Sequence, residues 1–414
     1  MQNKMRTRCC IAGGGPAGMM LGLLLARAGV DVIVLEKHGD FLRDFRGDTV
    51  HPSTLQVMQE LDLLQDFLRR PHDKARELRI AIAGRELAVA DFSRLKTQCN
   101  FIALMPQWDF LDFLRDHAMN YSGFHLLKNA EVTGLLEEGE CTTGVRVTTC
   151  EGELHIHADL VIGADGRHST VRRAAGLTVR DLGAPIDVLW MRLPTAPTDP
   201  VNTGARLETG RFFVMIHRGT YWQCAYVIPK GGFDAIRARG LVEFHNALAT
   251  AAPLFADRVR ALQWDDIKLL SVTVDRLERW WKPGLLCIGD AAHAMSPIGG
   301  VGINLAIQDA VASANILASA LATPAIDATQ LTPLLQRVQQ RRFFPARATQ
   351  AAQVAIQNRI LMPVVGRQQD QPLGVPWPVK MLDRWPWLRT LPAYAVGIGV
   401  RPEHVHSPIV TPCP

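Results

Sequence analysis

The stretch CCIAGGGPAGMMLGLLLARAGVDVIVLE, residues 9–36, joins two short apolar runs through a glycine-rich turn and a longer apolar run. We expect a strand over 9–12, a helix over 17–28 that ends at Gly29, and a strand over 30–35. A strand, a helix and a strand in this order form a βαβ unit. The sequence therefore predicts an α/β protein whose first element is a nucleotide-binding type of unit.

The turn GGGPAG, residues 13–18, has the glycine spacing of a dinucleotide site. Gly13 permits a tight turn, Gly15 lets the backbone approach a pyrophosphate, and Gly18 lets the helix pack closely on the strand. The N-terminus of the helix offers free N–H groups and a positive dipole end to phosphates. Glu36 ends the second strand and can accept hydrogen bonds from a ribose diol. FAD and NAD both remain open here, because both contain an ADP half.

Length and composition limit the alternatives. With 414 residues, of which 48% are hydrophobic, the chain is long enough for two or three globular domains. Its net charge of +5 is spread along the chain, which permits an anionic cofactor but does not indicate nucleic acid. None of the eight cysteines forms a CxxC pair, so we expect buried thiols, no metal site and a cytoplasmic protein. We find no secretion signal and expect no transmembrane segment.

Other segments predict the rest of the chain. We expect a hairpin over 78–89, helices over 53–64, 107–119, 233–252 and 304–321, separate strands over 154–157 and 160–164, and a helix over 331–360 that Pro345 kinks. Residues 187–228 contain short aromatic runs typical of an antiparallel sheet.

Two further motifs follow the opening turn. GADGRHS, residues 163–169, comes after a buried strand, and GDAAHAMSPIGGVGINLAIQDA, residues 289–310, comes after another. The order and spacing of the three motifs resemble the single-component flavoprotein monooxygenases, the aromatic hydroxylases typified by para-hydroxybenzoate hydroxylase. The resemblance covers roughly residues 6–345.

This resemblance implies a Rossmann-like FAD-binding domain of the GR2 type, an inserted β-sheet substrate domain and a C-terminal helical segment. The FAD-binding domain would comprise residues 1–75, 99–178 and 275–345, and the substrate domain residues 76–98 and 179–274. Residues 346–414 would form a helix and a proline-rich strap. About seventy residues follow Gln340, too few for the thioredoxin-like domain of one branch of the family.

The resemblance also implies the cofactor site. Glu36 would bind the ribose, Asp165 would line the groove between flavin and nicotinamide, and Asp290 would bind the ribityl chain. The full set is Gly13, Gly15, Pro16, Ala17, Gly18, Glu36, Lys37, Arg46, Gln107, Asp165, Gly289, Asp290, Gly300, Val301, Gly302, Ile303 and Asn304. His293 would be structural support, and His51 would be either near the flavin ring or an exposed loop histidine.

The glycines of residues 299–302 fit the same reading. A reduced flavin carries negative charge at N1 and the C2 carbonyl, which the N-terminus of the following helix would stabilise. The implied reaction uses NADH or NADPH to reduce FAD, and O2 to form a flavin C4a-hydroperoxide that hydroxylates an electron-rich ring. The protein must exclude water from this site, and no side chain is assigned as an acid or a base.

The aromatic substrate would lie between the flavin and the β-rich segment. Candidate pocket residues are Phe213, Met215, Tyr221, Trp222, Gln223, Tyr226 and Pro297. Strand alternation decides which of them point inward. The motifs do not fix the substrate, which ranges from a simple phenol or heteroaromatic to a polyketide such as a tetracycline, and they leave a monomer or a homodimer open.

Three other functions share the motifs. One is an FAD-dependent reductase or dehydrogenase such as an isoprenoid-chain reductase. Another is a ubiquinone-pathway type of hydroxylase, for which the tryptophan- and proline-rich tail would be a peripheral membrane contact. The third is a flavin-binding sensor. A halogenase is disfavoured, because residues 385–387 depart from the halogenase motif after the second tryptophan.

Overall fold

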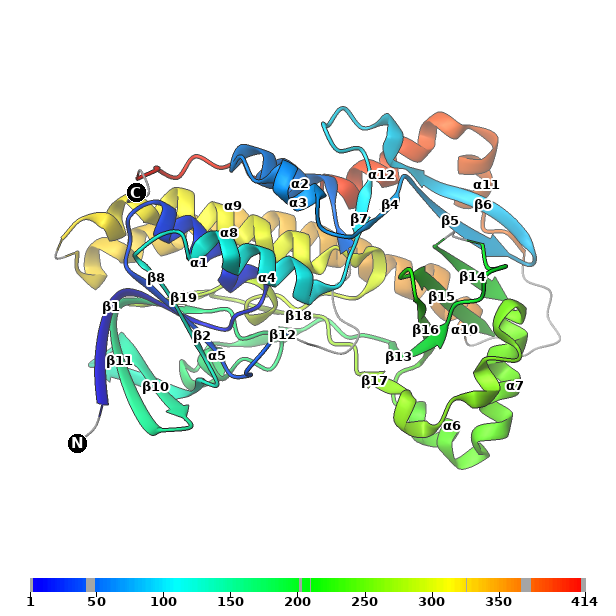
Figure 1. The fold of residues 1–414 in the computed structure, drawn as a ribbon, viewed down its shortest axis with the longest axis horizontal. Coiled ribbons are helices and arrows are strands. Elements are labelled where there is room, and N and C mark those ends of the chain that lie inside the picture. The colour runs from blue at the N-terminus through cyan, green and yellow to red at the C-terminus, as the bar shows by residue number, and fades with distance from the viewer. Residues whose placement is uncertain are drawn as a thin grey trace.

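A largely parallel sheet forms the centre of the computed structural model, which describes residues 3–41, 49–200, 203–208, 210–324, 326–365 and 374–410 (Figure 1). Its strand order is β19-β20-β11-β1-β2-β8, and β9 and β10 extend it beside β11. The strands are β1 (Asn3–Ala12), β2 (Val32–Glu36), β8 (Phe124–Lys128), β9 (Glu131–Glu138), β10 (Cys141–Thr149), β11 (Gly152–Gly163), β19 (Trp281–Lys282) and β20 (Leu285–Cys287).

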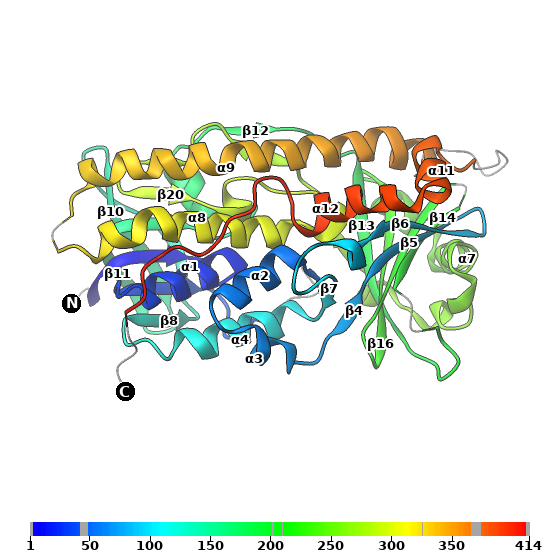
Figure 2. The same ribbon diagram turned by 90° about the horizontal axis from the view of Figure 1, so that it is seen from above.

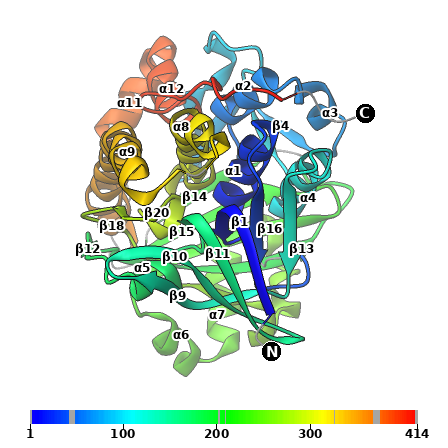
Figure 3. The same cartoon turned by 90° about the vertical axis from the view of Figure 1, so that its left-hand side faces the viewer.

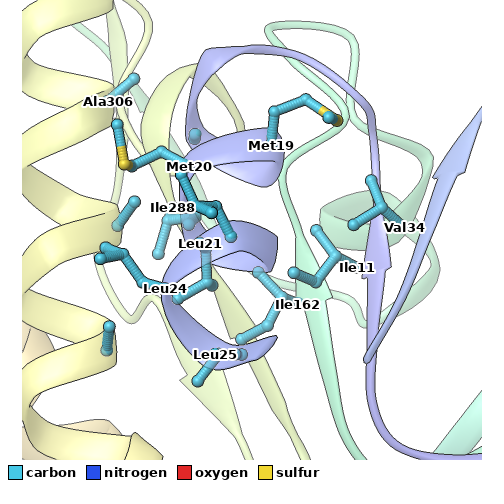
Figure 4. Close-up of a cluster of buried hydrophobic side chains, with 14 of the residues drawn as sticks. Ile11, Met19, Met20, Leu21, Leu24, Leu25, Val34, Ile162, Ile288 and Ala306 are labelled. Carbon is cyan, nitrogen blue, oxygen red and sulfur yellow. The ribbon is translucent and has the colours of Figure 1, made fainter. Parts of the chain in front are cut away.

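Four helices form a layer on one side of this sheet (Figure 3). They are α1 (Pro16–Arg27), α4 (Gln107–Ala118), α8 (Gly302–Ala322) and α9 (Ala328–Ile356). The helix α1 is buried on nearly every side, because it lies between the sheet and α8. Figure 4 shows Met20 and Leu24 directed toward α8, while Ile11, Val34 and Ile162 cover the strands. The all-round apolar pattern of residues 17–28 is explained by this double contact.

A second, seven-stranded sheet has the order β17-β13-β16-β15-β14-β5-β6. Its strands are β5 (Glu77–Ile82), β6 (Arg85–Asp91), β13 (Ile186–Pro194), β14 (Gly204–Glu208), β15 (Arg211–His217), β16 (Tyr221–Pro229) and β17 (Lys268–Leu270). Two helices, α6 (Phe233–Arg239) and α7 (Leu241–Ala251), cover its outer face (Figure 1). Smaller sheets join β3 (Thr49–Val50), β7 (Ile102–Leu104) and β4 (Asp73–Ala75), and β12 (Val179–Asp181) with β18 (Asp275–Leu277).

The sequence-based element boundaries were wrong in four places. The two strands expected over 154–164 are one long strand, β11, because its first half pairs with β10 and its second half with β20. The helix expected over 233–252 breaks at Gly240, whose φ of 95° is not helical. The helix expected over 53–64 divides into α2 (Pro52–Glu60) and α3 (Leu64–Leu68). The helix expected over 331–360 is α9, which begins at Ala328 and ends at Ile356, because residues 357–361 form a π-helical turn; Pro345 lies buried inside α9.

The C-terminal segment has three short helices and an extended tail. The helices are α10 (Met362–Val365), α11 (Trp377–Arg384) and α12 (Thr390–Gly397). From residue 398 the tail runs back past α8 and α2, and Val410 donates a hydrogen bond to the carbonyl of Arg27 (Figure 2). One apolar segment, Ile298–Ala322, is long enough to cross a membrane by length and composition. Since 72% of its apolar window is buried inside the protein, it serves as the core helix α8.

Candidate functional site

The three sequence motifs meet at the carboxyl ends of adjacent parallel strands. Gly13 N–H donates to the carbonyl of Leu35, and Ala164 N–H donates to the carbonyl of Ala12. Ile288 N–H donates in turn to the carbonyl of Gly163. The loops after β1, β2, β11 and β20 are therefore side by side, which is where ligands bind in open α/β sheets.

Three of the four glycines in the first turn have distinct reasons. Gly13 has a φ of 110°, and a Cβ there would lie 2.3 Å from the carbonyl oxygen of Ala164. A Cβ at Gly18 would lie 2.0 Å from the carbonyl oxygen of Gly13. At Gly15, by contrast, a Cβ would meet no described atom within 4 Å. Two glycines thus serve packing, and the third keeps an open approach to the N-terminus of α1, which no side chain caps.

Glu36 is fixed at the end of β2. Its carboxylate accepts hydrogen bonds from the N–H of Gly14 at 3.2 Å and from the N–H of His38 at 3.0 Å. These bonds hold the carboxylate against the glycine turn. Lys37 follows it on the surface.

The second motif places a buried carboxylate in the same loop cluster. One oxygen of Asp165 accepts a hydrogen bond from Val171 N–H at 3.0 Å, and the other is buried without a partner among the described residues. Burial raises the pKa of Asp165, although hydrogen bonds from Ser169 and Val171 oppose the shift. Such an unpartnered buried oxygen points to a missing hydrogen-bond donor.

Asp290 comes at the end of β20. Its carboxylate lies 3.4 Å from Nη2 of Arg167, so the second and third motifs are joined by an ion pair. Arg172, in the next turn of the chain, forms a buried two-pronged pair with Asp275. Sequence reasoning assigned no role to these arginines, although two arginines close behind an Asp-Gly pair are a readable signal.

One of the glycines before α8 does not need a flat ligand to explain it. A Cβ at Gly300, whose φ is 64°, would lie 2.5 Å from Oγ1 of Thr49, and that hydroxyl donates to the Gly300 carbonyl. Close contact with β3 is therefore sufficient reason for this glycine. Pro297 begins the turn, its carbonyl accepts from Gly300 N–H, and Val301, Gly302 and Ile303 lead into the uncapped start of α8.

Asn304 has a structural use that the motif did not reveal. Its Oδ1 accepts hydrogen bonds from His51 N–H at 3.0 Å and from the Thr54 hydroxyl at 2.7 Å. The side chain therefore ties the first turn of α8 to the first turn of α2.

His51 is fully buried, so the alternative of an exposed loop histidine is wrong. Its Nδ1 lies 2.8 Å from the carbonyl oxygen of Val396 in α12, and this oxygen can only accept, so Nδ1 carries the proton. The Nε2 atom is then a buried acceptor without a partner among the described residues. Burial lowers the pKa of His51 to about 4, against the opposing effect of the Val396 bond, so the ring is neutral at pH 7.

A network of buried charged residues supports the third motif on the side that faces the protein core. Asp309 accepts from Gly289 N–H at 3.0 Å and lies 2.6 Å from Nε2 of His293. Its other oxygen accepts from Nε of Arg342 at 2.9 Å, and Nη1 of Arg342 lies 3.2 Å from Glu403 in the tail. Burial opposes ionisation of Asp309, but His293 and Arg342 outweigh it and lower its pKa. His293 thus has the supporting position that the resemblance implies.

Two expected cofactor residues are less constrained. Gln107 is the first residue of α4, which packs against α1, and its side chain makes no hydrogen bond to another described residue. Arg46 lies outside the described residues.

Comparison with known proteins decides the family. A family model described as an FAD binding domain matches residues 6–351. A monooxygenase of *Streptomyces rimosus*, 6-methylpretetramide 4-monooxygenase, is 35% identical over 318 residues, which are 76% of each chain. This chain belongs to the single-component FAD-dependent monooxygenases.

Two further similarities agree with this assignment. Rifampicin monooxygenase of *Streptomyces venezuelae* is 30% identical over 310 residues, and this chain spans only 61% of its length. The solved structure of PqsL, described as a probable FAD-dependent monooxygenase from *Pseudomonas aeruginosa*, has a TM-score of 0.71 and 24% identity. It covers 88% of this chain and 98% of PqsL, and it supports the fold.

The loop cluster of the monooxygenase fits FAD. The backbone is open at Gly15, Asp165 has an unpartnered buried oxygen, and no side chain caps the N-terminus of α8. An ADP half on the first turn and a flavin ring before α8 would use each of these features. The side chain of Asp290 remains partly exposed beside Arg167.

Four of the seven candidate pocket residues lie on the face of the second sheet that α6 and α7 cover. Phe213 pairs with Tyr226, and Trp222 pairs with Leu193, on the face of the second sheet that packs against α6 and α7. Met215 packs against the same cluster, and rings such as Phe244 and Phe255 fill it. Phe213, Met215, Trp222 and Tyr226 are therefore core residues between the sheet and its helices, and they do not line the opposite face of the sheet.

The opposite face of this sheet packs against α10 and against the loop before α8. Trp190 and Val214 both lie directly across from Ala225, so the three share that face. They pack in one cluster with Ile298, the residue after Pro297. Tyr221 and Gln223 alternate with Ala225 at two-residue steps along β16, so they belong to this face. The sequence did not single out Trp190, because alternating aromatic residues are compatible with either face of a sheet.

Proposed function

We propose that this monooxygenase hydroxylates a polycyclic aromatic compound of the polyketide type, with NADH or NADPH as reductant and O2 as oxygen source. The observation that carries the proposal is the 35% identity to 6-methylpretetramide 4-monooxygenase over three quarters of both chains. The name of the rifampicin monooxygenase also supports a large polycyclic substrate over a simple phenol.

When bound, FAD supplies hydride acceptance from NAD(P)H and activation of O2. The residues of the chain hold and insulate it. The first turn and Glu36 would hold the ADP half, and Asp290, which Arg167 orients, would hold the ribityl chain. The N-terminus of α8 would favour negative charge on a ring bound before it.

We place the substrate against the sheet face formed by Trp190, Phe212 and Val214, next to Pro297 and Ile298. This face is apolar, so it suits an aromatic ring system and would exclude water from the reacting atoms. Tyr221 and Gln223 lie farther along the same face, where they can contact oxygen substituents.

The domain boundaries given above are part of the proposal. The FAD-binding part is residues 1–75, 99–178 and 275–345, and the substrate part contains β5, β6 and β13–β17. The seven described cysteines are free, which supports a reducing, cytoplasmic compartment.

The test is NAD(P)H oxidation by the FAD-loaded protein across three substrate sets: tetracyclic polyketides, simple phenols and ubiquinone precursors. We expect a tetracyclic compound to stimulate NAD(P)H oxidation most and to gain a hydroxyl group. Stimulation by simple phenols or ubiquinone precursors alone would contradict the substrate class, and reduction of a substrate without oxygen gain would favour a reductase.

A further inference from the structure

Among the described residues, the exposed Trp and Tyr side chains lie in the C-terminal segment 377–394, and one exposed Phe, Phe344, lies in α9. Trp377, Trp387 and Tyr394 are 72%, 64% and 52% exposed, and Trp385 is also exposed. Among the described residues, these are the only tryptophans and the only tyrosine with that degree of exposure. Apolar rings of this size are seldom left in water without a partner.

The exposed residues follow the helical repeat. In α11, residues Trp377 and Met381 are four apart and lie on one side of the helix, and the exposed Trp385 directly follows its last residue. In α12, residues Leu391 and Tyr394 are three apart and are exposed together. We call these five residues with Trp387 the C-terminal aromatic surface. Figure 2 shows α11 and α12 at the surface of the molecule beside β5 and β6.

The charges beside this surface are mainly positive. Lys380 and Arg384 are exposed on α11, and neither has an ion-pair partner among the described residues. The acidic residue of α11, Asp383, already pairs with Arg85 at 2.6 Å. The surface therefore combines large interfacial rings with two available cations.

We propose that the C-terminal aromatic surface docks on an anionic phospholipid membrane. Tryptophan and tyrosine favour the boundary between headgroups and acyl chains, and short amphipathic helices with lysine or arginine beside them bind there. The available cations complement anionic headgroups. Docking does not depend on which substrate the enzyme hydroxylates.

The opposite side of α12 connects this surface to the flavin-binding region. Gly397 packs closely against Phe92 and Leu95, and the carbonyl of Val396 accepts from His51. Val396 also lies beside Gly299 in the loop before α8. A membrane on the outer side of α12 would thus be one helix away from the proposed site, where an apolar polyketide dissolved in the bilayer could enter.

Vesicle co-sedimentation of the FAD-loaded full chain tests the proposal. The two probes are vesicles of phosphatidylcholine alone and vesicles of phosphatidylcholine with phosphatidylglycerol. We expect binding to the anionic vesicles that weakens as salt is raised. The double variant Trp387→Ser/Leu391→Ser should bind roughly tenfold more weakly, because two apolar side chains no longer enter the interface. Lys380→Gln/Arg384→Gln should lose the preference for anionic vesicles.

The matched control is Val242→Ser/Leu254→Ser, which removes exposed apolar residues from the region of α7 and should bind like the wild type. Retained flavin and an unchanged melting temperature show that each variant is folded. Wild-type protein that stays in solution with anionic vesicles at low salt would overturn the proposal. Light scattering can also contradict the proposal. If the wild type is a dimer and the Trp387→Ser/Leu391→Ser variant is a monomer, this surface is a self-association interface.

Discussion

Asp309 is the carboxylate at the centre of the buried charge network. It is fully buried in an apolar helix and is shared by Gly289, His293 and Arg342. The lone acidic residue in the apolar run of residues 302–322 was a signal in the sequence. Its partner in α9 was not, because only the tertiary structure brings Arg342 beside it.

Replacement of Asp309 by asparagine should destabilise the protein. Arg342 would lose its buried counter-charge on this side, and a broken buried pair costs about 3–5 kcal/mol. Urea unfolding would measure the loss, and flavin content should fall because Gly289 loses its anchor. Asp66→Asn is the control, since its pair with Arg69 is exposed and is worth less than about 1 kcal/mol. Equal stability of both variants would contradict the network.

Gly15 and Gly18 should respond to alanine in opposite ways. Gly18→Ala places a Cβ against the Gly13 carbonyl, so the free energy of unfolding should fall in the apoprotein. Gly15→Ala meets open space, so the apoprotein should keep its stability while FAD affinity drops about tenfold or more. Thermal unfolding and flavin titration measure the two effects. Normal FAD affinity in Gly15→Ala would argue against a pyrophosphate at this turn.

His51 should make stability depend on pH. Its pKa in the folded protein is about 4, below the ordinary 6.5, so the unfolded chain takes up the proton first as the pH falls. The contribution of the neutral ring is complete above pH 6.5 and is lost between pH 6.5 and about 4, by roughly 3 kcal/mol at most. Unfolding of wild type and His51→Gln over this range should give a difference that shrinks as the pH falls. A constant difference would mean that the buried ring does not titrate in this way.

At the scale of elements, the βαβ unit, the GADGRHS and GDAAH loops and the core helix α8 were predictable from the sequence. Their glycines and buried runs are local signals. The orientation of the second sheet was not predictable, because both of its faces are covered and alternate residues are apolar on both. Strand alternation divides Phe213 from Val214 but does not say which of them meets the flavin.

Substitutions at two tryptophans distinguish the faces. Trp222→Ala removes a fully buried ring that donates to Asp199, and it should cost about 3–5 kcal/mol of stability. Trp190→Ala should cost less stability but should lower the fraction of consumed NAD(P)H that yields hydroxylated product, because water gains access to the site. Product-to-NAD(P)H ratios and urea unfolding report the two quantities. A normal ratio in Trp190→Ala would move the substrate away from this face.

At the scale of the whole molecule, the C-terminal tail was the least predictable part. Residues 398–410 have no helical or strand repeat, and their contacts are hydrogen bonds between side chains and backbone, such as that of Val405 N–H with Glu60. The tail also closes the charge network through Glu403, which pairs with Arg341 and Arg342. Such long-range bonds leave no periodic signal in a sequence.

The replacement Glu403→Gln should loosen this tail. The amide removes the charge that faces Arg341 and Arg342, at a cost of about 1–3 kcal/mol. Hydrogen exchange should then be faster in residues 401–410 while the sheet around β1 stays protected. Exchange that rises equally throughout the chain would show global destabilisation rather than release of the tail.

Oxygen tracing tests the central claim, an FAD-dependent monooxygenase acting on a polycyclic aromatic compound, most directly. The FAD-loaded protein would be given NAD(P)H, a tetracyclic polyketide and isotopically labelled O2 in unlabelled water. We expect a hydroxylated product that carries one labelled oxygen atom. A product without label, or NAD(P)H oxidation that yields only hydrogen peroxide with every polycyclic compound, would contradict it.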